Sequence, residues 1–128
     1  MEDCLFCKIV KGEIPAEKVY EDSEFVAFMD IYPVMKGHTL MIPKFHVEWM
    51  QDANDELIAK LFVQVKHLMK KMKENLNCDF VQIGVVGEAV KHLHIHLIPR
   101  YLDDNMLRWP ILTYNDGEMQ DYANKIKG

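Results

Sequence analysis

The stretch Lys91–Arg100, KHLHIHLIPR, places a histidine at every second position, with an apolar residue between each pair. A period of two predicts a β-strand, because successive side chains on a strand point to opposite faces of the sheet. The histidines His92, His94 and His96 would share one face, and the leucine and isoleucine residues between them the other. We expect the apolar face to pack against a helix and the imidazoles to line a cleft or face solvent.

A long helix is predicted to cover that apolar face. Residues 53–76 carry apolar side chains at helical spacing, polar caps at the start and lysines in the last turns. Shorter helices are expected at residues 4–11 and 116–127. Strands are expected at residues 18–20, 25–29, 38–42, 79–85 and 90–98, the last two joined by a short turn at Gly87. This order predicts an α+β fold with an antiparallel sheet rather than a repeat of strand–helix–strand units.

Length and charge limit the possible functions. A chain of 128 residues suits a single domain with one core, and we expect one domain over residues 1–128. A net charge of −5 argues against a nucleic acid partner, which requires a basic surface. No signal peptide and no membrane-spanning stretch are recognised. Three cysteines suit a reducing cytoplasm better than a disulfide framework, so a cytoplasmic location is expected.

Three aligned imidazoles call for a chemical explanation. A single histidine, such as His67 in the long helix, is usually a structural residue. Burying three rings together requires a hydrogen-bond partner for each of them. Two interpretations remain open from spacing alone. One is a metal site, because neutral imidazole is a common ligand; the other is nucleophilic catalysis at phosphorus, because imidazole can attack a phosphate and leave again.

The histidine stretch is accompanied by further recognisable segments. CLFCKIVKGEIP, VYED, AFMDIYP and GHTLMIPKFH precede it in that order. With the repeated His-apolar motif, these segments resemble the histidine triad (HIT) superfamily of nucleotide hydrolases and transferases, in its nucleotide-binding branch. The resemblance covers residues 4–100 and is weaker in the tail, 101–128. It implies a five-stranded antiparallel sheet with one long helix and shorter terminal helices.

The resemblance also implies roles for individual polar residues. By similarity His94 is the nucleophile, which attacks the α-phosphorus of a nucleotide and forms a covalent nucleotidyl-histidine that water hydrolyses. His96 and His38 resemble flanking histidines that contact phosphate oxygens and stabilise charge in the transition state. Asp30 matches a carboxylate that accepts hydrogen bonds from both ribose hydroxyls. The implied enzyme is a purine nucleoside phosphoramidase or nucleotide hydrolase, acting on phosphoramidates, adenylates or dinucleoside polyphosphates.

The remaining nucleotide contacts are implied by the same resemblance. Apolar residues correspond to the family's slot for the base, and ordinary core packing is the alternative explanation for each: Leu5, Phe6, Ile9, Phe28 and Ile31. Gln82 lies where the family has an amide that reaches the phosphate. The apolar character of the slot does not separate adenine from guanine.

A structural zinc site and a homodimer are the other implications. Alone, the Cys4-x-x-Cys7 spacing is a weak signal, compatible with redox chemistry or half of a zinc site. Some branches of the family bind structural zinc through such a pair, together with histidines that correspond to His46 and His92. Two sulfurs and two nitrogens form the tetrahedral set that zinc prefers. Family members also form homodimers with one continuous sheet, and the broad apolar stripe of the long helix is compatible with this.

One segment departs from the family pattern. Many members have a Gly-Gln step and a hydroxyl residue shortly before the triad, whereas this chain has Glu88 and Ala89. Two alternatives to an efficient hydrolase therefore stay open. The first is a nucleotide-binding regulatory module with low turnover, and the second is a metal hydrolase whose zinc is held by the triad itself. The physiological leaving group is not encoded in any motif we recognise.

Overall fold

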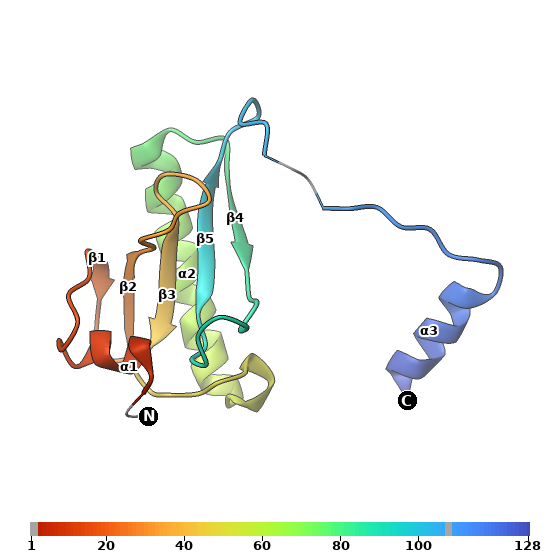
Figure 1. The fold of residues 1–128 in the computed structure, drawn as a ribbon, viewed down its shortest axis with the longest axis horizontal. Coiled ribbons are helices and arrows are strands. Elements are labelled where there is room, and N and C mark those ends of the chain that lie inside the picture. Colours follow the sequence, from red (N-terminus) through yellow and green to blue (C-terminus); the bar gives the residue numbers. More distant parts are fainter. Residues whose placement is uncertain (1–2, 107–108) are drawn as a thin grey trace.

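The structure, a computed structural model, describes residues 3–106 and 109–128, and its centre is one antiparallel sheet. The strands are β1 (Lys18–Glu21), β2 (Phe25–Met29), β3 (Thr39–Pro43), β4 (Phe80–Gly84) and β5 (Ile95–Arg100). Their spatial order is β1-β2-β3-β5-β4, and every neighbouring pair is antiparallel (Figure 1). The predicted α+β class and the five-stranded antiparallel sheet are therefore confirmed.

The long helix α2 (Asp55–Leu76) forms where the apolar periodicity predicts it. The side chain of Asn54 caps its first turn by accepting a hydrogen bond from the backbone N–H of Leu57 at 2.8 Å. Its C-cap, Asn77, adopts a left-handed conformation with φ of 54°. One face is buried at helical spacing, at Leu61, Val65, Leu68 and Met72. This stripe packs against the sheet and fixes the position of the helix.

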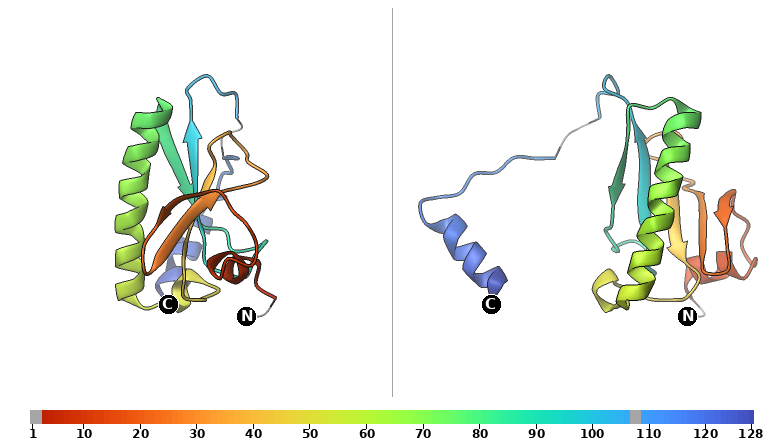
Figure 2. Two further views of the ribbon diagram at one scale, coloured as in Figure 1. Left: turned by 90° about the vertical axis from the view of Figure 1, so that its left-hand side faces the viewer. Right: turned by 180° about the vertical axis from the view of Figure 1, so that it is seen from behind.

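The two faces of the sheet carry different apolar clusters. The face under α2 buries Leu93, Ile95 and Leu97 with the helix stripe, which is the packing expected for the apolar side of the histidine stretch. The opposite face is covered by the short helix α1 (Leu5–Val10), whose Phe6 and Ile9 pack on β2 and β3. Figure 2 shows α1 and α2 on opposite sides of the sheet. The histidine side of β5 therefore lies on the α1 face.

The approach to β5 differs from the predicted strand at residues 90–98. Residues 85–94 form an irregular connection, and β5 begins only at Ile95. The backbone N–H of Leu93 donates to the carbonyl of Val47 at 2.7 Å, a residue outside the strands, so the sheet pairing stops before it. Only His96 of the three histidines is a strand residue. At its other end β5 continues through the buried Pro99, so that proline does not end the strand.

The C-terminal segment leaves the sheet after Arg100. The guanidinium of this residue is 4% exposed and pairs with the carboxylate of Asp104 at 2.7 Å, which holds the turn after β5. Beyond it an extended stretch leads to α3 (Glu118–Lys127), which lies apart from the sheet in Figure 1 and buries none of its side chains. Within the described ranges, no helix has the length and low charge needed to cross a bilayer.

Candidate nucleotide and metal sites

Strand register brings the predicted polar site residues to the α1 face. Leu40 of β3 pairs with Phe28 of β2 and with His96 of β5, so these three side chains form a row across the sheet. Asp30 follows Phe28 by two residues, and His38 precedes Leu40 by two. Side-chain alternation therefore places both on the same face as this row. Segments far apart in the sequence thus converge at one end of this row.

A cavity of about 390 Å³ opens beside that row, a size typical of small-molecule sites. Its walls are mainly apolar, and all five residues predicted for the base slot line it: Leu5, Phe6, Ile9, Phe28 and Ile31. Asp30, His94 and His96 lie at its polar side, together with Ala89 of the loop before β5. Sequence reasoning missed Ile14, Pro15 and Ala16, which return over the cavity after α1; the Gly12 and Pro15 turn signals could have suggested this return.

The His94 ring is held in one tautomer. Its Nδ1 lies 2.7 Å from the carbonyl oxygen of His92, and since a carbonyl can only accept, Nδ1 carries the proton. The other nitrogen, Nε2, then bears a lone pair and has no hydrogen-bond partner among the described residues. Among the described residues, every buried side-chain nitrogen has a hydrogen-bond partner. Since this Nε2 has none, it is not buried, although His94 as a whole is only 4% exposed. Phe6 packs edge-on against the ring, with centroids 5.1 Å apart.

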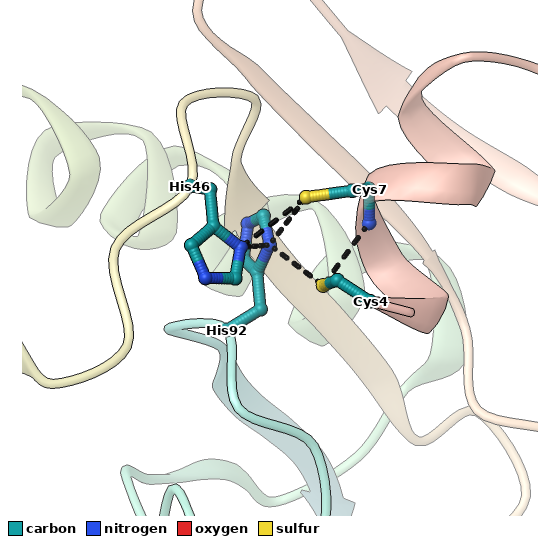
Figure 3. A group of neighbouring side chains, drawn as sticks. All are labelled: Cys4, Cys7, His46 and His92. Atoms are coloured by element: carbon teal, nitrogen blue, oxygen red, sulfur yellow. Dashed lines mark hydrogen bonds between the residues drawn. The ribbon is translucent and has the colours of Figure 1, made fainter. Parts of the chain in front are cut away.

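His92 points away from this cavity into a cluster with Cys4, Cys7 and His46 (Figure 3). The ring is fully buried, and its Nε2 donates to the carbonyl of Pro43 at 2.8 Å. The Nδ1 lone pair is thereby directed at the cluster, where it lies 3.4 Å from the Cys4 sulfur and 3.5 Å from the Cys7 sulfur. Nδ1 of His46 is 3.2 Å from both this nitrogen and the Cys7 sulfur.

These separations fit a tetrahedral metal site. With metal–nitrogen bonds of about 2.0 Å and metal–sulfur bonds of about 2.3 Å, tetrahedral ligands lie about 3.3 Å (N–N) and about 3.5 Å (N–S) apart. Four of the six distances within the cluster are 3.2 to 3.5 Å, close to these edges, and all four ligand atoms lie within 4.8 Å of one another. Burial raises the pKa of the Cys7 thiol, with a further rise from Cys4, so a cation would be needed to keep the Cys7 sulfur as a thiolate. The four residues can therefore hold a metal ion.

A second group of possible ligands is formed by Asp30, His38 and His96. Nε2 of His38 lies 2.9 Å from Nδ1 of His96 and 3.6 Å from a carboxylate oxygen of Asp30. The other nitrogen of His38 accepts a hydrogen bond from the backbone N–H of Val34 at 3.2 Å. Both nitrogens of His38 are engaged and the side chain is 4% exposed, which leaves it no free donor for a phosphate.

The three triad histidines do not form one ligand set. Among the described residues, His92 belongs to the cluster with Cys4, Cys7 and His46 (the cysteine cluster). His96 belongs to the group with Asp30 and His38 (the aspartate group), and His94 belongs to neither. Burial is the largest cause of a lowered pKa at His38, His92 and His96, which keeps these rings neutral near pH 7. The geometry therefore speaks against a single metal ion bound by the triad.

Two further residues lie away from the cavity. Gln82 is on β4, and its amide oxygen accepts a hydrogen bond from Arg100 at 2.6 Å, so it is not brought together with the other nucleotide residues. Glu88 is exposed and is not among the cavity-lining residues, whereas its neighbour Ala89 is. Of the two residues that depart from the family pattern, only Ala89 therefore borders the cavity.

Comparison with known proteins gives consistent matches. A family model described as "HIT domain" matches residues 11–103. "Protein hit" of Bacillus subtilis is 43% identical over 109 residues, which cover 78% of this chain and 72% of that protein. The adenosine 5'-monophosphoramidase hnt1 of Schizosaccharomyces pombe is 37% identical and matches 97% of this chain and 98% of its own length.

Solved structures give the same fold. The crystal structure of SMU.412c from Streptococcus mutans has a TM-score of 0.90 and 36% identity, and covers 99% of this chain and 85% of that one. A Zn-bound histidine triad family protein from Mycobacterium smegmatis has a TM-score of 0.79 and 33% identity, with 86% and 85% of the two chains covered.

Proposed function

Because this chain belongs to the HIT domain family, we propose that it is a nucleotide hydrolase that releases a nucleoside monophosphate through a covalent intermediate on His94. The bond cleaved would join the α-phosphorus to an amine, acyl or phosphate leaving group. The observation that carries the proposal is the accessible Nε2 of His94, whose lone pair is fixed by the hydrogen bond from Nδ1 to the His92 carbonyl. The relative from Schizosaccharomyces pombe, named as an adenosine 5'-monophosphoramidase, supports the reaction class.

In the proposed reaction, Nε2 of His94 attacks the α-phosphorus, and the bond from phosphorus to the leaving group breaks as the new P–N bond forms. The leaving group departs with the bonding electron pair and takes up a proton. Water then attacks the nucleotidyl-histidine and gives up a proton to solvent, which balances the proton taken up by the leaving group; the P–N bond breaks, its electron pair returns to Nε2, and the monophosphate is released with the ring restored. The carbonyl of His92 stabilises the positive charge that develops on His94, because it accepts a hydrogen bond from the Nδ1–H group throughout the reaction.

Asp30 and the apolar wall are proposed to hold the nucleoside. One carboxylate oxygen of Asp30 accepts the backbone N–H of Tyr32 at 2.9 Å, which fixes the side chain at the cavity edge. Its side chain is 20% exposed, so the carboxylate can accept hydrogen bonds from ribose hydroxyls. The base would lie against Phe6, Ile9 and Phe28, which present no hydrogen-bonding side chain to distinguish adenine from guanine.

We propose zinc as the metal of the cysteine cluster. Its ligands would be Cys4, Cys7, His46 and His92, and bound zinc would supply a structural cross-link rather than an open catalytic position. The donor set and its near-tetrahedral spacing support this, as does the Zn-bound relative from Mycobacterium smegmatis. The cross-link would join α1, which covers the cavity, to the backbone segment whose carbonyl orients His94.

A homodimer with a continuous sheet is also proposed, and the edge strand β4 supports it. Phe80 and Ile83 of this strand are 38% and 37% exposed, and Val63 of α2 is 47% exposed. An exposed apolar edge strand is a ready template for pairing with another chain. Light scattering after size exclusion should give twice the mass of one chain, and a Val81→Pro variant, which removes a backbone donor of β4, should shift the mass toward that of one chain. A parent protein with the mass of one chain would refute the dimer.

The test of the proposed reaction uses adenosine 5'-phosphoramidate and the full chain. We expect AMP release by the parent protein and a loss of about 10⁴-fold or more in His94→Gln, with AMP still bound. His67→Gln is the matched control, because His67 is exposed on α2. Reactions quenched with denaturant at alkaline pH, where a P–N bond to histidine survives, should contain protein carrying one nucleotidyl group, absent in His94→Gln. AMP release by His94→Gln at the parental rate would refute the role of His94.

The second candidate is a nucleotide-binding module with negligible turnover. It is favoured by Ala89, which lines the cavity at a position where many relatives have a hydroxyl residue nearby. The same assay separates the two functions, because a module of this kind would bind AMP without releasing it from the phosphoramidate. An Ala89→Ser variant that gains turnover over a slow parent would show that the missing hydroxyl limits the rate.

A further inference from the structure

The hydrogen bonds around His38 determine which nitrogen of each neighbouring ring carries a proton. A backbone N–H can only donate, so the bond from Val34 at 3.2 Å means that Nδ1 of His38 bears a lone pair. In the neutral ring the proton is then on Nε2. This N–H lies 2.9 Å from Nδ1 of His96 but 3.6 Å from Asp30, so it donates to His96.

The same reasoning continues to His96. Its Nδ1 accepts from His38, so the proton of the neutral His96 ring is on Nε2. This Nε2 has no partner among the described residues, and no described side-chain nitrogen is both buried and without a partner. It is therefore accessible, on a ring that lines the cavity 5.0 Å from the His94 ring between centroids.

We propose that His38 is a positioning residue, which fixes the tautomer of His96 so that His96 presents an N–H donor, and not a lone pair, to the reacting phosphoryl group. The inference rests on the proposed function and changes one part of it. His38 itself does not contact phosphate, because both of its nitrogens are engaged within the protein. A donor at His96 would stabilise an anionic phosphoryl oxygen or supply a proton to the departing atom, whereas a lone pair would repel either one.

Two other interpretations of the Asp30, His38 and His96 group are disfavoured by the Val34 contact. A metal ion bound to Nε2 of His38 would place the ring proton on Nδ1, where it would face the N–H of Val34. A protonated His38 paired with Asp30 would create the same clash of two donors. Burial also lowers the pKa of His38, although Asp30 acts in the opposite direction. The neutral chain of donors from Val34 through His38 to His96 satisfies every contact.

The test is the tautomer of His96, read from long-range ¹H–¹⁵N correlation spectra of the full chain, metal-loaded and ¹⁵N-labelled, with a His96→Asn spectrum for assignment. In the parent we expect the proton on Nε2. In His38→Phe we expect a mixture or a shift to Nδ1. In His38→Gln, whose amide can donate in place of Nε2, we expect the parental tautomer. A parental ring protonated on Nδ1, or a tautomer unchanged in His38→Phe, overturns the proposal.

A second variant covers the case in which His38→Phe does not fold. Val34→Pro removes the backbone donor and leaves the His38 side chain in place, and Val34 is 56% exposed, so little packing is lost. We expect the Nε2 proton of His38 to be partly transferred to Nδ1, with the parental His96 signal reduced. If both histidine tautomers remain parental in Val34→Pro, the proposed chain of donors is wrong.

Kinetics distinguish this inference from the proposed function. In His38→Phe we expect kcat to fall about 10-fold or more with KM nearly unchanged, and His38→Gln to recover most of the loss. Equal kcat in His38→Phe and the parent would overturn the positioning role. If the parent does not cleave the phosphoramidate at all, the proposed function fails, but the tautomer measurement still decides the hydrogen-bond chain.

Discussion

Two histidine clusters lie on the same side of this protein, and they differ in what their rings offer to the space between them. In the cysteine cluster, the carbonyl of Pro43 accepts a hydrogen bond from Nε2 of His92, so the lone pair on Nδ1 of this ring points into the cluster. In the group of Asp30, His38 and His96, the N–H of Val34 donates to Nδ1 of His38, so the N–H on Nε2 of this ring points into the group. Converging lone pairs and thiols suit a metal ion, whereas an alternating row of donors and acceptors is complete without one.

This difference shows that one backbone atom decides the chemistry of an imidazole. His94 follows the same rule, since the carbonyl of His92 holds its proton and leaves a nucleophilic nitrogen at the cavity. His92 belongs to both regions, with its ring in the metal cluster and its carbonyl on the proposed nucleophile. The proposed metal site and the proposed nucleophile therefore share one residue, and the following variants test them separately.

The largest effect should come from removing a cysteine ligand. We expect Cys7→Ser to weaken metal binding at least about 100-fold, because a buried thiolate is replaced by a neutral hydroxyl. His38→Phe should leave metal content at the parental one ion per chain. Metal analysis after dialysis against a chelator measures both variants. Equal metal loss in both, or two ions bound per parental chain, would contradict the assignment of the metal to the cysteine cluster alone.

The next effect concerns ribose recognition by Asp30. Hydrogen bonds to a charged group contribute about 1.5–3 kcal/mol, so Asp30→Asn should weaken AMP binding about 10-fold or more. Titration calorimetry with AMP and 2'-deoxy-AMP sharpens the test. The parent should prefer AMP, and the variant should bind the two ligands with similar affinity. A preference for AMP that survives in Asp30→Asn would place ribose recognition elsewhere.

A smaller effect is expected at Gly87, which supports the loop before the triad. This glycine has a φ of +77°, and a Cβ atom there would lie 2.8 Å from the ring of Trp49. Gly87→Ala should therefore lower the free energy of unfolding by about 1 kcal/mol or more, measured by urea denaturation. Gly12→Ala is a control with positive φ but open space around the Cβ position. Equal losses in both variants would mean that the Trp49 contact contributes nothing.

The smallest expected effect is on the pH dependence of stability. Burial lowers the pKa of His38 in the folded protein, so its contribution is fully present above the ordinary histidine pKa of about 6.5. That contribution is lost as pH falls toward the lower folded value, because the unfolded chain then binds the proton more readily. Urea denaturation at pH 7.5 and 5 should show a larger loss in the parent than in His38→Phe. A larger loss of unfolding free energy in His38→Phe than in the parent would contradict a lowered pKa at His38.

Much of the architecture followed from residue patterns. The apolar stripe of α2, its Asn54 cap and the predicted antiparallel order of strands are all observed. The predicted start of the last strand was wrong, because the Leu93 N–H pairs with Val47, a partner that no local pattern identifies. The predicted end of this strand at residue 98 was also wrong, since the buried Pro99 lies within β5.

The candidate site shows a similar division. Family resemblance selected residues that do line one cavity, including Asp30, His94 and the apolar wall. It also grouped Gln82 with them, although Arg100 holds that amide elsewhere. The expected location in the cytoplasm stays a prediction, since the arrangement of the described residues does not bear on it.

The sequence by itself determined that histidines and apolar residues alternate before Pro99, and that a long amphipathic helix exists to bury the apolar half. Only the tertiary structure decided that one of these rings faces two thiols, one faces a cavity and one accepts a hydrogen bond from His38. The physical reason is that the deciding partners are backbone groups. The carbonyl of Pro43, 49 positions from His92, is a group that every residue type carries, and the N–H of Val34 is one that every type except proline carries, so only the fold brings them to a particular imidazole.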